Sequence, residues 1–190
     1  KENSKKKITV WTSSGSLKSK ILGNNLVETE IGMPKNDWDQ IPLNKELDTK
    51  DLKIEIIDKD NNKHIGGTAV NVGNPHVIFF VNDIESFDLK NIGPKIENHK
   101  LFPKKCNVTL AKVINKNLIK VKVWERGAGL TKACGTAACA TVVAGNIKGL
   151  IDKTADIEFE LGKLTISIDE KNSIHMKGPV SDIKNIEIKL

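Results

Sequence analysis

The sequence predicts an α+β fold in which antiparallel strands wrap around a central helix of small residues. Three observations support it: apolar residues alternate with charged ones in several short segments, polar turns separate these segments, and one run of small apolar residues carries hardly any charge. A period of two is typical of a half-buried strand, and a long apolar run indicates a buried helix. With 190 residues, 38% of them hydrophobic, the chain can bury the core of one domain or two small lobes.

The clearest strand covers residues 119–123, where three apolar residues alternate with two lysines. The same alternation recurs at 157–161, 164–168 and 186–190. Polar turns at 58–63 and 169–173 separate such runs, which suits antiparallel hairpins. The sheet is therefore predicted to be largely a meander.

Two helices are predicted. The small-residue run at 136–148 predicts a buried helix, whose narrow side chains let strands pack closely around it. A second, shorter helix is expected to begin near Pro94, because proline suits the first turn of a helix, and to end before Lys100.

Charge and composition exclude several classes of function. The net charge is +6, but 24 acidic residues are interleaved with the basic ones and aromatic residues make up only 4%, so no nucleic-acid partner is predicted. No charged-then-apolar leader and no run of about 18 apolar residues occurs, so we expect a cytoplasmic protein with no membrane partner. Cys106, Cys134 and Cys139 fit neither a disulfide framework nor a zinc site, which predicts free thiols.

Arg126 is the single arginine among 30 basic residues. Arginine differs from lysine chiefly where a planar fork must bind a carboxylate with two hydrogen bonds. Its presence in a chain that otherwise uses lysine raises the question of which group Arg126 binds.

The segment that carries chemistry reads W-E-R-G-A-G-L-T-K-A-C-G-T-A-A-C-A, from residue 124 to residue 140. It predicts a strand end, a glycine loop and then a helix that starts at Cys134, where free backbone N–H groups stabilise a thiolate and bind a substrate carboxylate. Gly135 allows close approach of that carboxylate, and Thr136 adds a hydroxyl. The alternative is that Cys134 is a small buried hydrophobic residue, the role we expect for Cys106 and Cys139.

A second constellation is Gly73-Asn74-Pro75-His76, between apolar runs at 68–72 and 77–81. Proline biases Asn74 toward an extended conformation and marks a turn where side chains can face a cleft. His76 has the ordinary pKa range to influence a nearby thiol or carboxylate. The alternative is a plain β-turn without function.

Taken together, G-N-P-H and E-R-G-A-G-L-T-K-A-C-G-T-A-A-C-A strongly resemble the C-terminal part of diaminopimelate epimerases. Similarity extends through Gly93-Pro94 with Glu97 and His99, through Phe102-Pro103, and to the closing M-K-G-P at 176–179. The resemblance implies two similar α+β lobes, each with strands around a central helix. It also implies inversion of an α-carbon by two thiols on opposite faces, with no cofactor.

The resemblance assigns roles to individual residues. Cys134 would be one of the two thiols, and Gly135 and Thr136 would hold the reacting carboxylate. The distal carboxylate would be bound by Asn74, Asn107 and Arg126, and the distal ammonium by Glu125. His76 and Glu125 match positions that tune the thiol pair, so Cys134, His76 and Glu125 form the predicted catalytic group.

The sequence departs from the family pattern in one large respect: the M-C-G-N-G-type segment that bears the other thiol has no counterpart here. Cys106 does not replace it, since it lacks a glycine-rich helix start. We therefore expect residues 1–38 to be the connection from a missing N-terminal lobe, 39–178 the C-terminal lobe, and 179–190 a strand returning toward the first lobe. The change from the usual glycine to Ala137 suits a helix.

The leading hypothesis is part of an epimerase that converts LL- to meso-diaminopimelate for lysine and cell-wall precursor synthesis. The alternatives are a related racemase or isomerase acting on another amino acid, a non-catalytic remnant that binds at most a ligand, and a homodimer that brings two Cys134 thiols to one cleft. We expect the isolated chain to lack full activity, because a single lobe does not exclude water from the carbanion.

Overall fold

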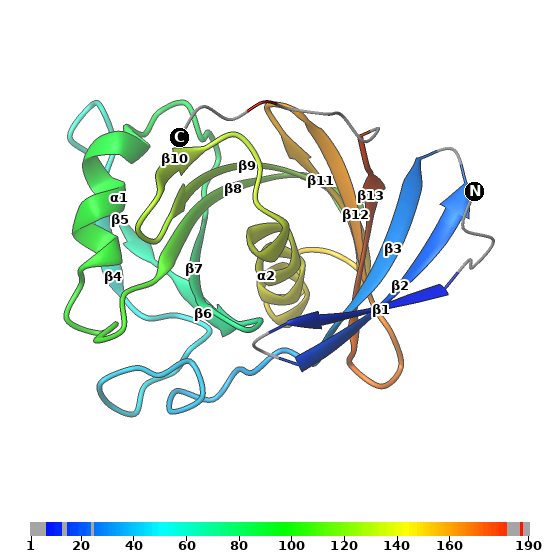
Figure 1. Cartoon of the computed structure of the whole chain (residues 1–190). Helices are drawn as coiled ribbons and strands as arrows, with labels where there is room; N and C mark the ends of the chain where they lie inside the picture. The colour runs from blue at the N-terminus through cyan, green and yellow to red at the C-terminus, as the bar shows by residue number, and fades with distance from the viewer. Residues whose placement is uncertain (1–6, 13–14, 24, 182–186, 188–190) are drawn as a thin grey trace.

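The computed structural model of the chain describes residues 7–12, 15–23, 25–181 and 187 (Figure 1). Within these residues strands predominate over two helices, which confirms the predicted α+β class. The helices are α1 (Leu89–Glu97) and α2 (Gly135–Ile147). The strands are β1 (Lys7–Thr12), β2 (Gly15–Gly23), β3 (Leu26–Gly32), β4 (Ile54–Ile57), β5 (Lys63–Gly66), β6 (Thr68–Asn71), β7 (Pro75–Phe80), β8 (Asn107–Asn115), β9 (Leu118–Glu125), β10 (Gly129–Thr131), β11 (Thr154–Phe159), β12 (Gly162–Ile168) and β13 (Ile174–Pro179).

One 11-stranded sheet runs in the order β1-β2-β3-β13-β12-β11-β9-β8-β7-β6, with β10 paired to β9, and β4 and β5 form a separate hairpin. The strands predicted at 119–123, 157–161 and 164–168 are confirmed as β9, β11 and β12, although β11 ends at Phe159. Both predicted polar turns join antiparallel neighbours, β4 to β5 and β12 to β13. The strand predicted at 186–190, and most of the predicted returning segment 179–190, lie outside the described residues.

The predicted meander is wrong at two places, because β7 pairs with β8 and β9 pairs with β11 in parallel. Parallel neighbours need a long crossover connection, which is usually helical. Here α1 lies between β7 and β8 along the chain, and α2 lies between β9 and β11. Each helix therefore belongs to a crossover that local alternation in the strands does not reveal.

The sheet curls around α2, which packs against β6, β7, β8, β11, β12 and β13 (Figure 1). Residues 137–145 of this helix are all buried, which confirms the predicted small-residue helix to within one residue at each end. Small side chains are necessary here: a Cβ atom on Gly145 would lie 2.9 Å from a side-chain carbon of Ile151 in the loop that follows and 3.5 Å from the ring of Phe80 in β7. Helix and sheet thus approach closely, as predicted.

The shorter helix α1 belongs to a second core on the opposite face of β7 and β8. Val77 and Phe79 of β7 face this second core, whereas Ile78 faces α2. The predicted start near Pro94 is wrong, because α1 begins five positions earlier, where the side chain of Asp88 accepts a hydrogen bond from the Lys90 amide. An N-cap of this kind satisfies a free N–H of the first turn, and Pro94 lies inside the helix.

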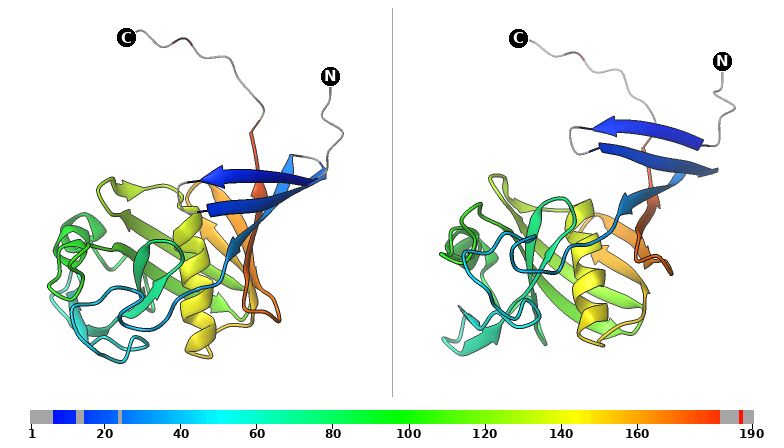
Figure 2. Two further views of the ribbon diagram at one scale, coloured as in Figure 1. Left: turned by 60° about the horizontal axis from the view of Figure 1, so that its bottom comes forward. Right: turned by 90° about the horizontal axis from the view of Figure 1, so that it is seen from below.

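Strands β1 to β3 project from the body of the molecule (Figure 2) and join it through the antiparallel pair of β3 with β13. The register pairs Val10 with Leu17 and Ile21 with Val27, so one face of this three-stranded sheet is apolar. The apolar face carries Ile8, Val10, Leu17, Ile21, Val27 and Ile31 together with the hydrogen-bonded pair Ser19 and Thr29, and of its apolar residues only Ile31 packs against the α2 core. The other apolar side chains on this face are partly or largely exposed, Ile8 at 47% and Val10 at 46%.

Candidate active site

The candidate site forms where β9 turns back into β10 and the chain then enters α2. Gly127 and Gly129 have φ angles of +77° and +88°, in the region that favours glycine, so the glycines of the loop allow this tight turn. The turn brings Glu125, at the end of β9, back toward Cys134, the N-cap residue of α2. The predicted strand, loop and helix start are confirmed.

Cys134 is only 8% exposed, and its thiol donates a hydrogen bond of 3.1 Å to Oε2 of Glu125. Burial raises the pKa of this thiol, and the Glu125 carboxylate raises it further, while hydrogen bonds from Thr136 and the Ala137 amide act in the opposite direction. The predicted effect of the helix start is present but is outweighed. The helix start thus lowers the pKa of Cys134 as expected, but burial and Glu125 raise it more, and the net balance of this arrangement favours the thiol.

Asn74 connects His76 to the start of α2. Its Oδ1 lies 2.9 Å from Nε2 of His76, and its Nδ2 donates a hydrogen bond of 3.4 Å to Oγ1 of Thr136. The Thr136 hydroxyl lies 3.5 Å from Sγ of Cys134. The two predicted constellations, 62 residues apart at Asn74 and Thr136, are therefore in direct contact.

Asn107 connects the other side of the site. It begins β8 and pairs in register with His76 of β7. Its Nδ2 donates a hydrogen bond of 3.0 Å to the Pro75 carbonyl, and its Oδ1 accepts one of 3.0 Å from the Arg126 amide. The Arg126 guanidinium is directed by a hydrogen bond of 2.9 Å from Nη1 to the Lys104 carbonyl.

Together with the peptide bonds that join Glu125 to Arg126 and Pro75 to His76, these contacts form a closed ring. It runs from His76 through Asn74, Thr136, Cys134, Glu125 and Arg126 to Asn107, which returns to the Pro75 carbonyl beside His76. Gly135 lies between two members of the ring. The structure thus brings together every residue predicted for the site, and their individual roles stay predictions.

His76 is fully buried, and its Nδ1 has no hydrogen-bond partner among the described residues. Burial lowers the pKa of His76 to about 3, and the positive charge of Arg126 contributes to this shift. The imidazole of His76 is therefore neutral at physiological pH. Its pKa lies below the ordinary range that the sequence led us to expect. A neutral imidazole can accept or donate a hydrogen bond but adds no charge to the site.

The other two cysteines are buried away from solvent, as predicted. The Cys106 thiol donates to the Ile96 carbonyl at 3.6 Å, and burial raises its pKa. Cys139 lies within α2, and burial raises its pKa to about 12. Neither thiol is available for acid or base chemistry in this arrangement.

Within the described ranges, no group of three or more His, Cys, Asp or Glu side chains is arranged to hold a metal ion. Among the same residues, neither helix is long and apolar enough to cross a membrane.

The sequence profile of the diaminopimelate epimerase family matches residues 68–183, more than half of the chain. The chain belongs to this family. A diaminopimelate epimerase of Pelagibacter ubique (strain HTCC1062) is 81% identical over 190 residues, which are 100% of this chain and 69% of that protein. One of Acidiphilium cryptum (strain JF-5) is 38% identical over 180 residues, 95% of this chain and 63% of that protein. The chain thus carries the sequence of an amino-acid epimerase, an isomerase, over about two thirds of these relatives' length.

Solved structures of low sequence identity share the family fold. A PhzF-family phenazine biosynthesis protein of Bacillus anthracis has a TM-score of 0.63 at 14% identity, with 99% of this chain and 70% of that chain covered. A hydroxyproline epimerase of Agrobacterium vitis has a TM-score of 0.57 at 11% identity, with 94% and 58% covered. These likenesses concern the fold alone, and they confirm the predicted epimerase-like architecture.

Two residues that surround the site, Glu97 and Trp124, were not given a role from the sequence. Glu97, the last residue of α1, is 6% exposed and accepts a hydrogen bond of 2.7 Å from Nε1 of Trp124. It also accepts one of 3.2 Å from the Gly127 amide. The family resemblance included Glu97 without giving it a role, and its contacts with the turn have no local sequence signal, because the partners lie 27 and 30 residues away.

Proposed function

We propose that Cys134 is one of two thiols with which this enzyme inverts the α-carbon of diaminopimelate, and that Glu125 is its proton partner. The observation that carries the proposal is the 3.1 Å hydrogen bond from the Cys134 thiol to the Glu125 carboxylate at the start of α2. Inversion needs an acid on one face of the α-carbon and a base on the other.

In the resting arrangement Cys134 holds a proton that it can deliver to a carbanion. In the reverse direction Cys134 must act as a thiolate, and Glu125 is placed to accept the thiol proton first. The raised pKa of Cys134 supports this order, because a thiol that keeps its proton near neutral pH is an acid until the carboxylate removes that proton. His76, neutral by burial, accepts or donates through Nε2 to Asn74 and so supports the side of the site next to Thr136 and Cys134.

The same ring offers groups for the substrate's charges. The amides at the start of α2 around Gly135 and Thr136 suit the carboxylate at the reacting centre, as helix N-termini commonly bind anions. Arg126, exposed and directed by the Lys104 carbonyl, suits the distal carboxylate together with Asn74 and Asn107. Glu125 carries the negative charge that suits the distal ammonium.

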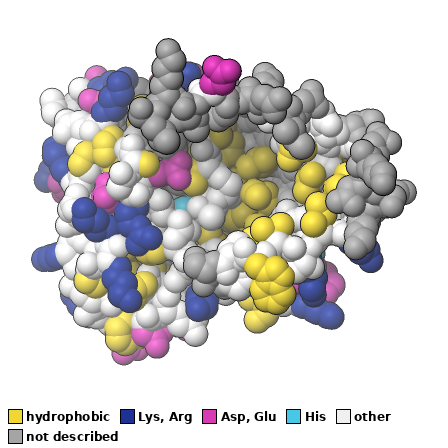
Figure 3. All heavy atoms as spheres, viewed as in Figure 1, with side chains coloured by type: hydrophobic (Ala, Val, Ile, Leu, Met, Phe, Trp, Pro, Cys, Tyr) yellow, Lys and Arg dark blue, Asp and Glu magenta, His cyan; other side chains and the backbone are white. Residues whose placement is uncertain are grey.

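The described residues supply only one usable thiol, so the second must come from elsewhere. The apolar face of β1 to β3 supports this view, because a half-exposed apolar sheet face calls for a further packed layer. Figure 3 shows a hollow lined by hydrophobic side chains beside α2 and over β11 to β13. The hollow lies next to β1 to β3. We propose that residues 1–38 connect to a first lobe that packs there, that residues 39–178 form the second lobe, and that 179–190 returns to the first lobe.

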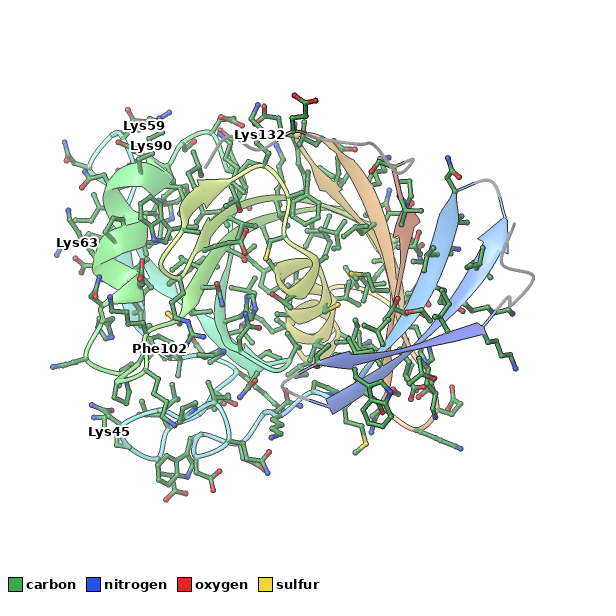
Figure 4. All side chains as sticks on the ribbon, in the orientation of Figure 1. Lys45, Lys59, Lys63, Lys90, Phe102 and Lys132 are labelled. Atoms are coloured by element: carbon green, nitrogen blue, oxygen red, sulfur yellow. The ribbon has the colours of Figure 1, made fainter. Side chains whose placement is uncertain are left out.

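We place the reaction in the cytoplasm, because three free cysteines suit a reducing compartment. A nucleic-acid partner is not part of the proposal. Lysines such as Lys45, Lys63, Lys90 and Lys132 point outward at separated positions rather than along one groove (Figure 4), and Lys63 and Lys132 pair with Glu55 and Glu160.

The test uses LL-diaminopimelate in heavy water, with mass spectrometry and chiral separation of the products. The isolated chain is compared with a completed chain, joined to the part of the Pelagibacter ubique relative that it does not cover. We expect deuterium at the α-carbon and meso product from the completed chain only. Cys134→Ala should abolish both, Glu125→Gln should reduce both, and Glu55→Gln, a carboxylate of the separate β4–β5 hairpin, should change neither.

Retained turnover in completed Cys134→Ala would contradict the proposal. Turnover by the isolated chain would instead favour a homodimer that brings two Cys134 thiols together, a second candidate that light scattering would confirm or remove. A panel of other amino acids would show whether the substrate is one without a distal charged end.

A further inference from the structure

The residues on both sides of the Glu125–Arg126 dipeptide are held by one carboxylate. Glu97 accepts the indole N–H of Trp124, the residue before the dipeptide, at 2.7 Å. With its other oxygen it accepts the backbone N–H of Gly127, the residue after the dipeptide, at 3.2 Å. A carboxylate that spans the two flanking residues fixes the path of the chain between them.

The contact is built into the interior rather than formed on the surface. Glu97 is 6% exposed, and its third partner is the Lys105 ammonium at 3.7 Å. A buried carboxylate is costly unless it is satisfied, so two hydrogen-bond donors and one ion-pair partner on one side chain restrict its position. Glu97 therefore acts as a fixed point for the turn.

Trp124 transmits that position to α1. A Cβ atom on Gly93 of α1 would lie 2.6 Å from two carbons of the Trp124 side chain, so the side chain packs directly on the helix backbone. Gly129, on the far side of the turn, would bring a Cβ atom to within 3.5 Å of the same ring. The indole thus lies between α1 and the turn, and Glu97, the last residue of α1, accepts hydrogen bonds from the indole and from the Gly127 amide.

We propose that Glu97 is a positioning residue of this site, which acts through Trp124 and Gly127 to aim the Glu125 carboxylate at Cys134 and to place Arg126. The inference rests on the function proposed above. It adds a residue of α1, outside the ring of hydrogen bonds, to those on which the reaction depends. Glu97 itself touches neither Cys134 nor any member of the ring through a side-chain hydrogen bond that the described residues show.

The first test needs only the isolated chain. Iodoacetamide alkylation of Cys134 is followed by peptide mass spectrometry from pH 6 to pH 11. Glu125 raises the pKa of Cys134, so a turn that no longer aims Glu125 should lower the pH at which alkylation reaches half its maximum. We expect this decrease in Glu97→Gln, which keeps one acceptor oxygen but loses the second, and in Trp124→Phe, which removes only the indole N–H. Glu55→Gln is the matched control.

The second test measures kcat and KM of the completed enzyme. Displacement of catalytic groups by about 1 Å can cost on the order of 100-fold, so we expect kcat/KM to fall about 10- to 100-fold in Glu97→Gln and Trp124→Phe. Both parameters should change, because Glu125 serves the thiol and Arg126 serves the distal carboxylate. Cys134 is thus alkylated more readily at a given pH while turnover falls. A general loss of activity does not produce this combination.

A purely structural role predicts a different result. The unfolding midpoint would fall, Cys106 and Cys139 would be alkylated faster along with Cys134, and kcat/KM measured well below the melting temperature would stay within about twofold of the control. That result in Trp124→Phe, the milder substitution, overturns the inference even if Glu97→Gln does not fold.

The two tests also distinguish the positioning role of Glu97 from the proposed catalytic role of Cys134. If Cys134→Ala abolishes turnover while the Glu97 and Trp124 variants match Glu55→Gln in both tests, only the positioning role is wrong. If Cys134→Ala keeps its turnover, the proposed function is wrong, and the alkylation profiles still decide whether Glu97 aims Glu125.

Discussion

At the scale of the residue, Cys134 is subject to opposing influences whose balance decides its protonation. The start of α2 and the Thr136 hydroxyl lower its pKa, while burial and Glu125 raise it more. Reactivity of a cysteine depends on its thiolate fraction, so this balance is measurable without substrate.

We therefore expect Cys134 in the isolated chain to be alkylated with a midpoint above the pKa of about 8.5 for a free cysteine. Glu125→Gln should lower the midpoint, because it removes the negative charge beside the sulfur. Peptide mass spectrometry after timed iodoacetamide labelling checks both values. An unchanged or higher midpoint in Glu125→Gln would show that burial alone sets the pKa.

The sequence was informative about this site where the chemistry is local. The glycine loop, the helix start and the G-N-P-H turn have recognisable patterns, and the structure brings their side chains into one ring. The direction of the Cys134 pKa shift was not predictable in the same way, because burial and the carboxylate of Glu125 depend on how the hairpin folds back. The role of Glu97 was not visible because its partners come from distant positions in the chain.

At the scale of the element, two hairpin turns have the same construction, Asp-x-x-Asn-x-x-His. In each, Asp Oδ1 accepts two backbone N–H groups of the turn, and Asp Oδ2 binds the histidine six residues later: Asp58 to His64 at 2.9 Å and Asp169 to His175 at 3.1 Å. The asparagines Asn61 and Asn172 have φ angles of +63° and +61°. These contacts satisfy the turn and join the two strands of each hairpin.

Asp58→Asn should destabilise the chain at pH 6 but not at low pH. The His64 hydrogen bond is the largest cause that lowers the pKa of Asp58, to about 2 from its ordinary 3.8. Because the pKa of Asp58 is lower in the folded state than in the unfolded chain, its ionised carboxylate stabilises the folded state at any pH above the unfolded-state pKa. This contribution is lost as the pH falls from about 4 through 2. The melting temperature gap between wild type and Asp58→Asn should therefore narrow from pH 6 to pH 3.

The matched control is Asp60→Asn in the same turn, whose side chain is exposed. Its melting temperature should follow that of the wild type at every pH. A gap for Asp58→Asn that stays constant down to pH 3 would show that Asp58 acts through its shape and not through its charge.

Periodicity in the sequence predicts where the strands and helices lie, but it does not predict which of them are neighbours. Alternation located β9, β11 and β12, and the small-residue run located α2, because those signals depend only on which face is buried. Alternation does not specify which strands become neighbours, so the two parallel pairs were not predicted. The start of α1 differs from the prediction because the helix begins at the Asp88 cap, while Pro94, which suits a first turn, lies inside the helix.

At the scale of the whole molecule, the apolar face of β1 to β3 is the feature that separates this chain from a self-sufficient fold. Its opposite face carries Lys18, Lys20, Glu28 and Glu30 together with the exposed Trp11, so the three strands are amphipathic apart from that one residue. Such a face calls for a packed partner, whether the rest of the enzyme or a second copy.

Val10→Lys should reduce self-association of the isolated chain and destabilise the completed enzyme. Val10 lies on the apolar face at 46% exposure, so a lysine there disfavours any partner layer. Thr9→Lys, one position away on the charged face, should change neither property. Light scattering of the isolated chain and thermal unfolding of the completed enzyme measure the two effects, and equal behaviour of both variants would exclude the apolar face as a contact surface.

The pairing of β3 with β13 has a consequence for how the protein is made. Gly32 and Ile174 are neighbours in the sheet although roughly 140 residues of chain separate them, and ribosomes add about 5–20 residues per second. For a time on the order of ten seconds, β3 is outside the ribosome with no neighbour on one edge. During translation this strand therefore depends on β2 alone for pairing, and the nascent chain is most exposed to aggregation in the interval before β13 emerges.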